Sequence, residues 1–232
     1  MDELLQPRAS ACERIQFEGS RFTICRYRRG QDRIALFLED ASGKPLRSLA
    51  ALERHLGPRA ADLRFAMNAG MYDRGGQPIG LYVEDGRERR ALNRRDGPGN
   101  FHLKPNGVFS VDADGRVAIT ATDRFRARQD IRWATQSGPM LVIDGDLHPR
   151  FSENGASLHV RNGVGVVDPD MAWFAISDEP VSFGRFARLF RDRLGCPNAL
   201  FLDGGVSSLW DRPSARRDAY PLLGPLLAVF SA

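Results

Sequence analysis

Long apolar runs are missing from this chain of 232 residues. No stretch approaches the roughly 20 consecutive apolar residues that a membrane-spanning helix needs, so we expect no membrane span. Linkers rich in serine, glycine or proline are also missing, as are internal repeats. We therefore expect a single domain over residues 12–232, preceded by an amino-terminal extension over residues 1–11.

The amino terminus reads MDELLQPRASAC and lacks a positively charged start followed by an apolar core. An intact signal peptide is therefore not predicted in the chain as given. A leader that has been cleaved or truncated stays open as the origin of the extension, which would then be a leader remnant.

Lysine is scarce, and only Lys44 and Lys104 occur. The formal net charge of +4 and the pI near 9.3 therefore come almost entirely from arginine. The arginines are dispersed, and their two densest clusters, residues 87–95 and 185–193, are interleaved with acidic residues. Neither cluster has the aromatic spacing of a base-stacking surface. We expect a solvated charged surface and no nucleic-acid partner.

Cysteine is limited to three residues. Cys12 and Cys25 flank a segment that is typical of two short strands around Glu18-Gly19-Ser20, and such a hairpin could bring the two thiols face to face. From the spacing alone, a disulfide and a pair of reduced buried cysteines both stay open. Cys196 has no base placed beside it in the sequence, and we interpret it as a buried small hydrophobe.

Short apolar segments broken by glycine turns make up most of the chain. Over residues 65–181 they predict a β-rich body of hairpins and meanders. Buried strands are also expected at residues 33–38 and 199–202, and residues 222–230 are apolar enough to close a sheet.

Two helices are predicted between these strands. Leucines recur at helical spacing over residues 46–56, with Ser48 near the start. An aromatic stripe over residues 183–194 predicts the second helix, which Ser182 can cap. The fold class is therefore α+β: one β-rich domain with a largely antiparallel or mixed sheet of hairpins and a few helices.

Five polar clusters interrupt apolar segments where a simple hairpin would not need them. A glycine beside a polar side chain lets backbone approach a ligand closely. For the Asn-Gly pairs in two of the clusters a pure turn role is an equal alternative. The clusters are Asn68-Ala-Gly70, Lys104-Pro-Asn106-Gly107, Gln136-Ser-Gly138-Pro139, Arg161-Asn-Gly163 and Asp203-Gly-Gly205.

Asp203 follows the buried strand at residues 199–202 and precedes two glycines. An Asx-type turn or a helix cap would explain it. Its position argues for an active site instead, because a carboxylate at the end of a buried strand is held rigidly and the two glycines clear space beside it.

Competing chemistries have weaker signals. No Gly-x-Ser-x-Gly elbow occurs, which disfavours a serine hydrolase. Asp112-Ala-Asp114-Gly115 lacks the later ligands of a calcium loop and is interpreted as a hairpin tip. The histidines form no zinc signature, and no motif ties one of them to a serine; they are His55, His102, His148 and His159.

Taken in order, the motifs resemble the phosphodiester glycosidase domain family, the family of the mannose-6-phosphate uncovering enzyme, and most of all its bacterial envelope branch. The resemblance covers roughly residues 12–230. The motifs that carry it are Asn68-Ala-Gly-Met-Tyr72, Pro78-Ile-Gly-Leu81, Pro105-Asn-Gly-Val-Phe109, Gln136-Ser-Gly-Pro-Met-Leu-Val142, Arg161-Asn-Gly-Val-Gly165 and Leu202-Asp-Gly-Gly-Val-Ser207.

The resemblance implies a glycosidase that acts on sugars in phosphodiester linkage, with a sugar phosphate or phosphoglycan as substrate. It places Asp203 and Arg161 in one pocket as catalytic residues. The substrate-binding residues would be Asn68, Gly70, Asn106, Gln136, Ser137, Gly138, Gly204, Gly205 and Ser207, with His102 and Lys104 as secondary candidates.

Location and disulfide pairing follow from the same resemblance. Bacterial members carry a cysteine pair near the amino terminus, which favours a disulfide between Cys12 and Cys25 and a periplasmic or exported protein. Just before Arg161, the stretch Ser157-Leu-His-Val160 lacks the basic residues that these members carry there, so anion affinity or substrate choice is expected to differ.

The chemistry of such a substrate suggests a mechanism. Phosphate is a good leaving group, so the usual glycosidase pair of carboxylates could reduce to one carboxylate and a cation. Asp203 would act as base or nucleophile, Arg161 would bind the phosphate in bidentate fashion, and Asn68 and Gln136 would hold sugar hydroxyls.

Two other functions stay open. A non-catalytic envelope module would bind a phosphoglycan in the same pocket, and a phosphodiesterase would cut the P–O bond with help from a metal. For the glycosidase no cofactor is expected to be required, although Asp and Asn oxygens suit a divalent cation.

Overall fold

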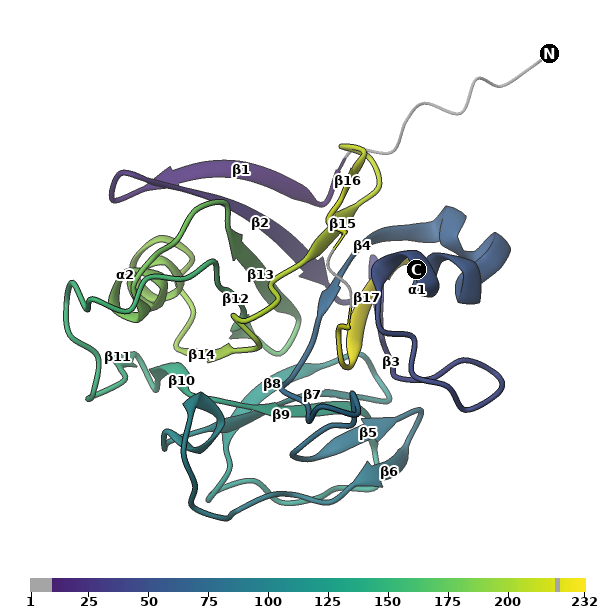
Figure 1. The fold of residues 1–232 in the computed structure, drawn as a ribbon, viewed down its shortest axis with the longest axis horizontal. Helices are drawn as coiled ribbons and strands as arrows, with labels where there is room; N and C mark the ends of the chain where they lie inside the picture. The colour runs from purple at the N-terminus through teal and green to yellow at the C-terminus, as the bar shows by residue number, and fades with distance from the viewer. Residues whose placement is uncertain (1–9, 220–221) are drawn as a thin grey trace.

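The computed structural model describes residues 10–219 and 222–232, so the predicted extension over residues 1–11 lies almost wholly outside the described part. Three antiparallel sheets form the body, with the first on the left, the second on the right and the third below in Figure 1. The predicted fold, β-rich with few helices, is confirmed.

The first sheet has seven strands, the other two five each. In spatial order the first contains β1 (Cys12–Phe17), β2 (Ser20–Arg28), β13 (Met171–Ser177), β12 (Asn162–Asp168), β14 (Asn198–Phe201), β10 (Met140–Ile143) and β11 (Asp146–Leu147). The second contains β16 (Arg216–Arg217), β15 (Leu209–Asp211), β4 (Leu63–Asn68), β17 (Leu226–Ser231) and β3 (Asp32–Phe37). The third contains β6 (Arg87–Arg90), β5 (Tyr82–Glu84), β9 (Ile131–Ser137), β7 (Gly107–Asp112) and β8 (Val117–Ala121).

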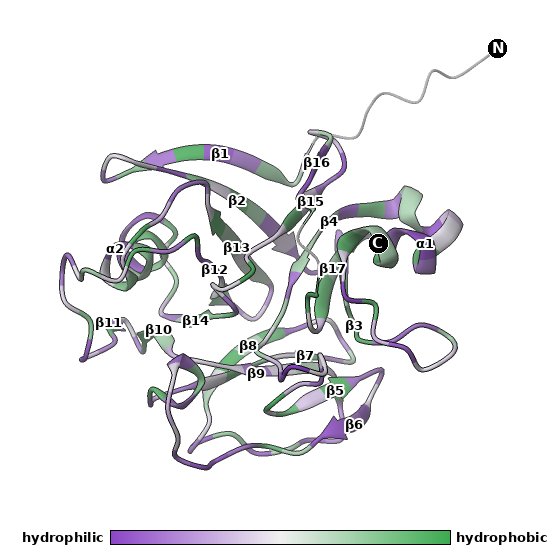
Figure 2. Ribbon diagram, in the orientation of Figure 1, coloured by the Kyte–Doolittle hydropathy of each residue, from purple (hydrophilic) through white to green (hydrophobic). Residues whose placement is uncertain are grey.

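Hydropathy follows position in the sheets. Strand β17 pairs on both sides and is buried along most of its length, whereas β6 lies at a sheet edge and is exposed. Figure 2 shows β17 as hydrophobic and β6 as hydrophilic. A charged edge strand disfavours pairing with another chain.

Both helices begin where the sequence predicts. Helix α1 (Leu49–Leu56) is capped by Ser48, whose hydroxyl accepts a hydrogen bond from the backbone N–H of Ala51. Helix α2 (Phe183–Arg188) is capped in the same way by Ser182 and continues as a π-helical turn over Leu189–Arg193. Such caps satisfy backbone donors that a helix start leaves unpaired. Within the described residues no helix is long and apolar enough to cross a membrane.

One phenylalanine from each sheet meets at the centre of the largest core cluster. The ring of Phe174 in β13 lies 5.4 Å from that of Phe65 in β4 and 5.8 Å from that of Phe109 in β7, measured between centroids. All three side chains are buried. Because aromatic rings bury large apolar areas in a fixed geometry, this contact sets how the three sheets sit against one another.

The two Asn-Gly pairs are not hairpin turns, contrary to the turn interpretation. Gly107 begins strand β7, and Asn162 and Gly163 begin strand β12. Gly163 has no room for a side chain, because a Cβ would lie 2.9 Å from the carbonyl oxygen of Leu200. The glycines therefore let strands pack closely, and both asparagines direct their side chains into the protein interior.

The expected disulfide is present. Cys12 and Cys25 are directly opposed across β1 and β2 and are bonded, with an S–S distance of 2.04 Å. Cys25 is fully buried in the core. Cys196 is buried and free, and burial raises the pKa of its thiol to about 12, in keeping with a small hydrophobe.

Replacing both bonded cysteines, as Cys12→Ser with Cys25→Ala, is expected to lower the free energy of unfolding by about 2–3 kcal/mol, because the crosslink closes a short loop in the unfolded chain. Urea denaturation measures the loss. A reducing agent should destabilise the wild type by a similar amount and leave the double variant unchanged. Equal midpoints for the wild type with and without reductant would contradict a stabilising disulfide.

Candidate active site

The backbone of Asp203 is clamped by two buried asparagines. The side-chain oxygen of Asn162 accepts a hydrogen bond from the Asp203 N–H at 3.1 Å, and the amide nitrogen of Asn68 donates to the Asp203 carbonyl oxygen at 3.0 Å. Asn68 is 1% exposed and Asn162 is fully buried. Buried amides that satisfy both backbone groups of one residue hold its conformation firmly.

The two asparagines also bind each other. The Asn162 amide donates to the backbone carbonyl of Asn68 at 2.9 Å and to its side-chain oxygen at 3.1 Å. That side-chain oxygen also accepts from the backbone N–H of Ser208 at 2.8 Å. The end of β4, the start of β12 and the segment after β14 are therefore joined by one network of side-chain amides.

Two serines complete the clamp around the same segment. The hydroxyl of Ser137, at the end of β9, donates to the Leu202 carbonyl oxygen at 2.5 Å. The hydroxyl of Ser207 lies 3.2 Å from the carbonyl oxygens of both Val160 and Asp203. Both serines are buried and bound to backbone, which suits a positioning role.

The carboxylate of Asp203 is only partly engaged. One oxygen, Oδ1, accepts a hydrogen bond from the Gly205 N–H at 3.0 Å, which is the Asx-type turn that the sequence allowed. Within residues 10–219 and 222–232, no arginine, lysine or histidine nitrogen lies within 4.0 Å of this carboxylate. Burial raises the pKa of the Asp203 carboxyl, and the Gly205 hydrogen bond offsets part of that effect. Asp203 therefore forms a turn and also keeps a carboxylate oxygen available for a ligand.

Arg161 directly precedes Asn162 in the sequence, but its guanidinium is held inside the protein. Nε donates to the carbonyl oxygen of Val181 at 2.9 Å, and Nη2 donates to that of Ser157 at 2.8 Å. The guanidinium carbon lies 3.6 Å from the centroid of the Phe183 ring, and the residue is 1% exposed. Burial lowers the pKa of Arg161 to about 10. Its role as a phosphate ligand stays a prediction, and these contacts favour a structural one.

Gln136 is directed to a different part of the chain. Its oxygen accepts from the backbone N–H groups of Leu81 and Asn93, both at 2.9 Å. Its nitrogen donates to the Asn93 carbonyl oxygen at 2.7 Å and to the Thr122 hydroxyl at 3.1 Å. These four contacts use the full capacity of the amide, so no group is left for a sugar hydroxyl.

The remaining polar candidates also bind the protein itself. Asn106 donates to the carbonyl oxygen of Phe101 at 2.8 Å. Lys104 pairs with Asp96 at 2.7 Å, and the Nδ1 atom of His102 lies 3.0 Å from the Arg95 carbonyl oxygen. Lys104 and Asn106 line a cavity of about 380 Å³, whose lining does not include Asp203.

Most of the predicted glycines make room for the protein rather than for a ligand. A Cβ on Gly70 would lie 2.4 Å from the Thr135 hydroxyl, and one on Gly138 would lie 2.6 Å from a backbone carbonyl. A Cβ on Gly204 would lie 2.5 Å from a ring carbon of Phe201. Gly205 differs, because it is exposed and a Cβ there would meet only Asp203, at 3.5 Å.

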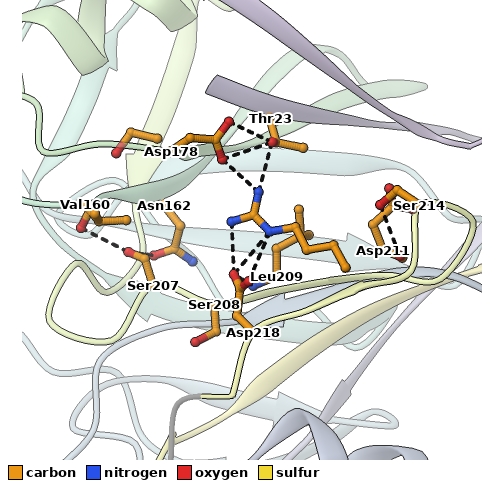
Figure 3. A network of polar contacts seen from close by, with 12 residues as sticks. Thr23, Val160, Asn162, Asp178, Ser207, Ser208, Leu209, Asp211, Ser214 and Asp218 are labelled. Atoms are coloured by element: carbon orange, nitrogen blue, oxygen red, sulfur yellow. Dashed lines mark hydrogen bonds and ion pairs between the residues drawn. The ribbon is translucent and has the colours of Figure 1, made fainter. Parts of the chain in front are cut away.

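A second polar network lies beside the clamp (Figure 3). Arg216 donates to Thr23 at 3.0 Å and to Asp178 at 2.7 Å, and it pairs with Asp218 at 3.0 Å. Asp218 in turn accepts from the backbone N–H of Leu209 at 3.0 Å. These bonds join the β15–β16 hairpin to the first sheet and so support the segment that contains Ser207.

Sequence reasoning missed the central member of the site. For Asn162 the Asn-Gly pair left a turn role and a site role equally open, and no role was predicted for Ser208. A signal was available, since Asn162 precedes an apolar strand and has no turn-forming residue before it. Among the described residues no group of three or more His, Cys, Asp or Glu side chains is placed to hold a metal ion.

Asp203 is thus a half-buried residue at a strand end, with its backbone clamped by two amides and its carboxylate bonded once, within a fold of three antiparallel sheets. The chain belongs to the phosphodiester glycosidase family, whose model matches residues 61–218. It is 36% identical over 184 residues to the uncharacterized protein YigE of Escherichia coli K12, a match that covers 79% of this chain and 72% of YigE.

Solved structures of other proteins share the fold. The zebrafish N-acetylglucosamine-1-phosphodiester alpha-N-acetylglucosaminidase catalytic domain, auto-inhibited by its pro-peptide, aligns with a TM-score of 0.62 at 15% identity, over 95% of this chain and 82% of that one. A putative exported protein of Burkholderia pseudomallei aligns with a TM-score of 0.63 at 11% identity, over 91% and 74% of the two chains.

The raised pKa of Asp203 has a measurable effect on stability. The native state holds this proton more tightly than the unfolded state, so the free energy of unfolding falls as pH rises from about 3.9, the ordinary aspartate value, through the raised value. The side chain introduced by Asp203→Asn cannot ionise, so the free energy of unfolding of this variant lacks that decrease with pH. We expect the variant to gain stability relative to the wild type between about pH 3 and pH 7.

Urea denaturation at both pH values measures the difference. Asp123→Asn, which alters an exposed carboxylate, is the matched control. A relative stability of Asp203→Asn that stays constant or falls with pH would contradict a raised pKa.

Proposed function

We propose that this protein hydrolyses a glycosyl-1-phosphodiester at the anomeric carbon, with Asp203 as general base. The observation that carries the proposal is the Asp203 carboxylate, which the asparagines hold by its backbone while one of its oxygens has no hydrogen-bond partner among the described residues. Family membership supports the reaction class. The name of the zebrafish protein describes the same kind of linkage, to N-acetylglucosamine.

The proposed step is a single displacement. A water oxygen forms a bond to C1 of the sugar while the bond from C1 to the phosphate oxygen breaks. Asp203 takes the proton that water loses, and the products are the free sugar and a phosphate monoester. A carboxylate with a raised pKa is a better base near neutral pH than an ordinary aspartate, which suits this role.

No second carboxylate is assigned to protonate the leaving group. The phosphate monoester is stable as an anion, so the leaving oxygen departs without a proton if positive charge is nearby. Asn68, Ser137 and Ser207 act in this proposal by fixing the Asp203 segment, since their polar groups bind its backbone.

An exported location fits the same proposal. A disulfide in the native protein is typical of an oxidising compartment. The shared fold with a putative exported protein of Burkholderia pseudomallei is in keeping with this. We therefore propose that the substrate is a phosphorylated sugar or glycan outside the cytoplasm.

Asp203→Asn is expected to lower turnover of a sugar-1-phosphate methyl diester by at least about a hundredfold while the fold is retained, because the amide cannot accept the proton. Hydrolysis in ¹⁸O-water by the wild type, followed by mass spectrometry, should place the label in the sugar. Asp123→Asn serves as the control for the substitution.

Each of these experiments has an outcome that would contradict the proposal. Label in the phosphate would show P–O cleavage and overturn the proposal, and so would a fully active Asp203→Asn. The anomeric configuration of the first product, followed by NMR, should be inverted, whereas retention would make Asp203 a nucleophile.

A further inference from the structure

The proposed reaction needs a cation at the phosphate, and two of the three guanidinium nitrogens of Arg161 already donate to backbone carbonyls. Arg47 is a cation from a different part of the chain. It immediately precedes Ser48, the cap of α1, and its own carbonyl oxygen accepts from the Leu223 N–H at 2.8 Å. Its backbone is in the left-handed region, with φ at 61°, which is uncommon for a residue with a side chain. Strain of this kind clusters at functional sites.

The Arg47 side chain is confined but not neutralised. Its guanidinium carbon lies 5.5 Å from the centroid of the Tyr72 ring. Nη1 packs on Gly76, where a Cβ would lie 1.7 Å from it. This nitrogen is buried and has no hydrogen-bond partner among the described residues. Within residues 10–219 and 222–232, no carboxylate lies within 4.0 Å of Arg47.

Tyr72 connects Arg47 to Asp203. Its hydroxyl donates to the Leu222 carbonyl oxygen at 2.8 Å, and its ring packs on Gly224, where a Cβ would lie 2.1 Å from a ring carbon. Tyr72 follows Asn68 by four residues, and Asn68 binds the Asp203 carbonyl oxygen directly. Tyr72 therefore contacts Arg47 and stands four residues after the asparagine that binds the Asp203 backbone.

Electrostatics support this placement. Burial raises the pKa of the Tyr72 hydroxyl to about 12; the charge of Asp203 adds to the increase, and the charge of Arg47 opposes it. One hydroxyl therefore interacts with both charges. The Asp203 carboxyl is affected by burial and by Gly205, so Arg47 is not its ion-pair partner. Both a base and a phosphate-binding group must act on one substrate, so a shared neighbour is what this pair of roles requires.

We propose that Arg47 binds the phosphate of the substrate, with the Tyr72 ring holding its guanidinium in place. This inference rests on the proposed function for the identity of the substrate. Arg47 lies outside residues 61–218, the part of the chain that the family model matches. The charge of the leaving group increases as the C1–O bond breaks, so a cation there stabilises the transition state more than the bound substrate.

Arg47→Met is expected to lower kcat/KM for a sugar-1-phosphate methyl diester by about 10- to 100-fold, as loss of a charge-assisted hydrogen bond would. Arg47→Lys should recover part of the loss, because it restores the charge without the bidentate geometry. Arg54→Met, at an exposed position of α1, is the matched control and should match the wild type. Circular dichroism establishes that each variant is folded, and Arg47→Gln replaces Arg47→Met if the latter is not.

A binding experiment separates this inference from the proposed function. Methyl phosphate is titrated into the wild type and the Arg47 variant by calorimetry. Binding that Arg47→Met weakens at least about tenfold supports the inference even if no diester is hydrolysed, a result that would overturn the proposed function alone. Hydrolysis and methyl phosphate binding that are both unchanged in Arg47→Met would overturn the inference alone. A wild type that neither hydrolyses the diester nor binds methyl phosphate overturns both.

Discussion

The side-chain amide of Asn162 is the contact on which the site depends. Its two hydrogens bind Asn68, and its oxygen accepts from the backbone of Asp203. A single buried amide therefore joins the first residue of β12 to the last residue of β4 and to the turn after β14. Such a group is stable in the interior only when every donor and acceptor is satisfied, and here they are. The position of Asp203 follows from this requirement.

The need to satisfy buried donors and acceptors also separates the residues that hold the site from those available to a ligand. The buried amide of Gln136 is fully bound to the protein, and two nitrogens of the buried Arg161 donate to backbone carbonyls. Their presence within apolar segments is explained by the loops they fasten. Asp203 and Arg47 each retain a polar atom with no hydrogen-bond partner among the described residues. Unused bonding capacity is a better indicator of ligand contact than polarity alone.

Much of the fold could be predicted from local patterns. The caps Ser48 and Ser182 lie directly before apolar stripes at helical spacing, and Cys12 and Cys25 flank a hairpin whose turn residues fix the register. These signals span a few residues each, so physical rules of short range suffice to interpret them. The strand before Asp203 was equally clear, because a continuous apolar run bounded by glycines has few alternatives.

The arrangement of the site could be predicted only in part. Asp203 was identified by its position after a strand, but Asn162 was not, because an Asn-Gly pair favours a turn unless its tertiary contacts are known. Arg47 is 156 residues from Asp203 in sequence, and no local pattern relates the two. Which polar group binds backbone and which stays free depends on how the three sheets meet at Phe65, Phe109 and Phe174. That information is not contained in any short segment.

A double-mutant cycle on turnover tests the central claim, that Asn162 acts by positioning Asp203. If it does, Asn162→Ala should slow hydrolysis of a glycosyl-1-phosphodiester in the wild-type background and cause no further loss once Asp203 is replaced by asparagine. Losses in turnover that multiply in the double variant would show that the two residues act independently, and would contradict this account of the site.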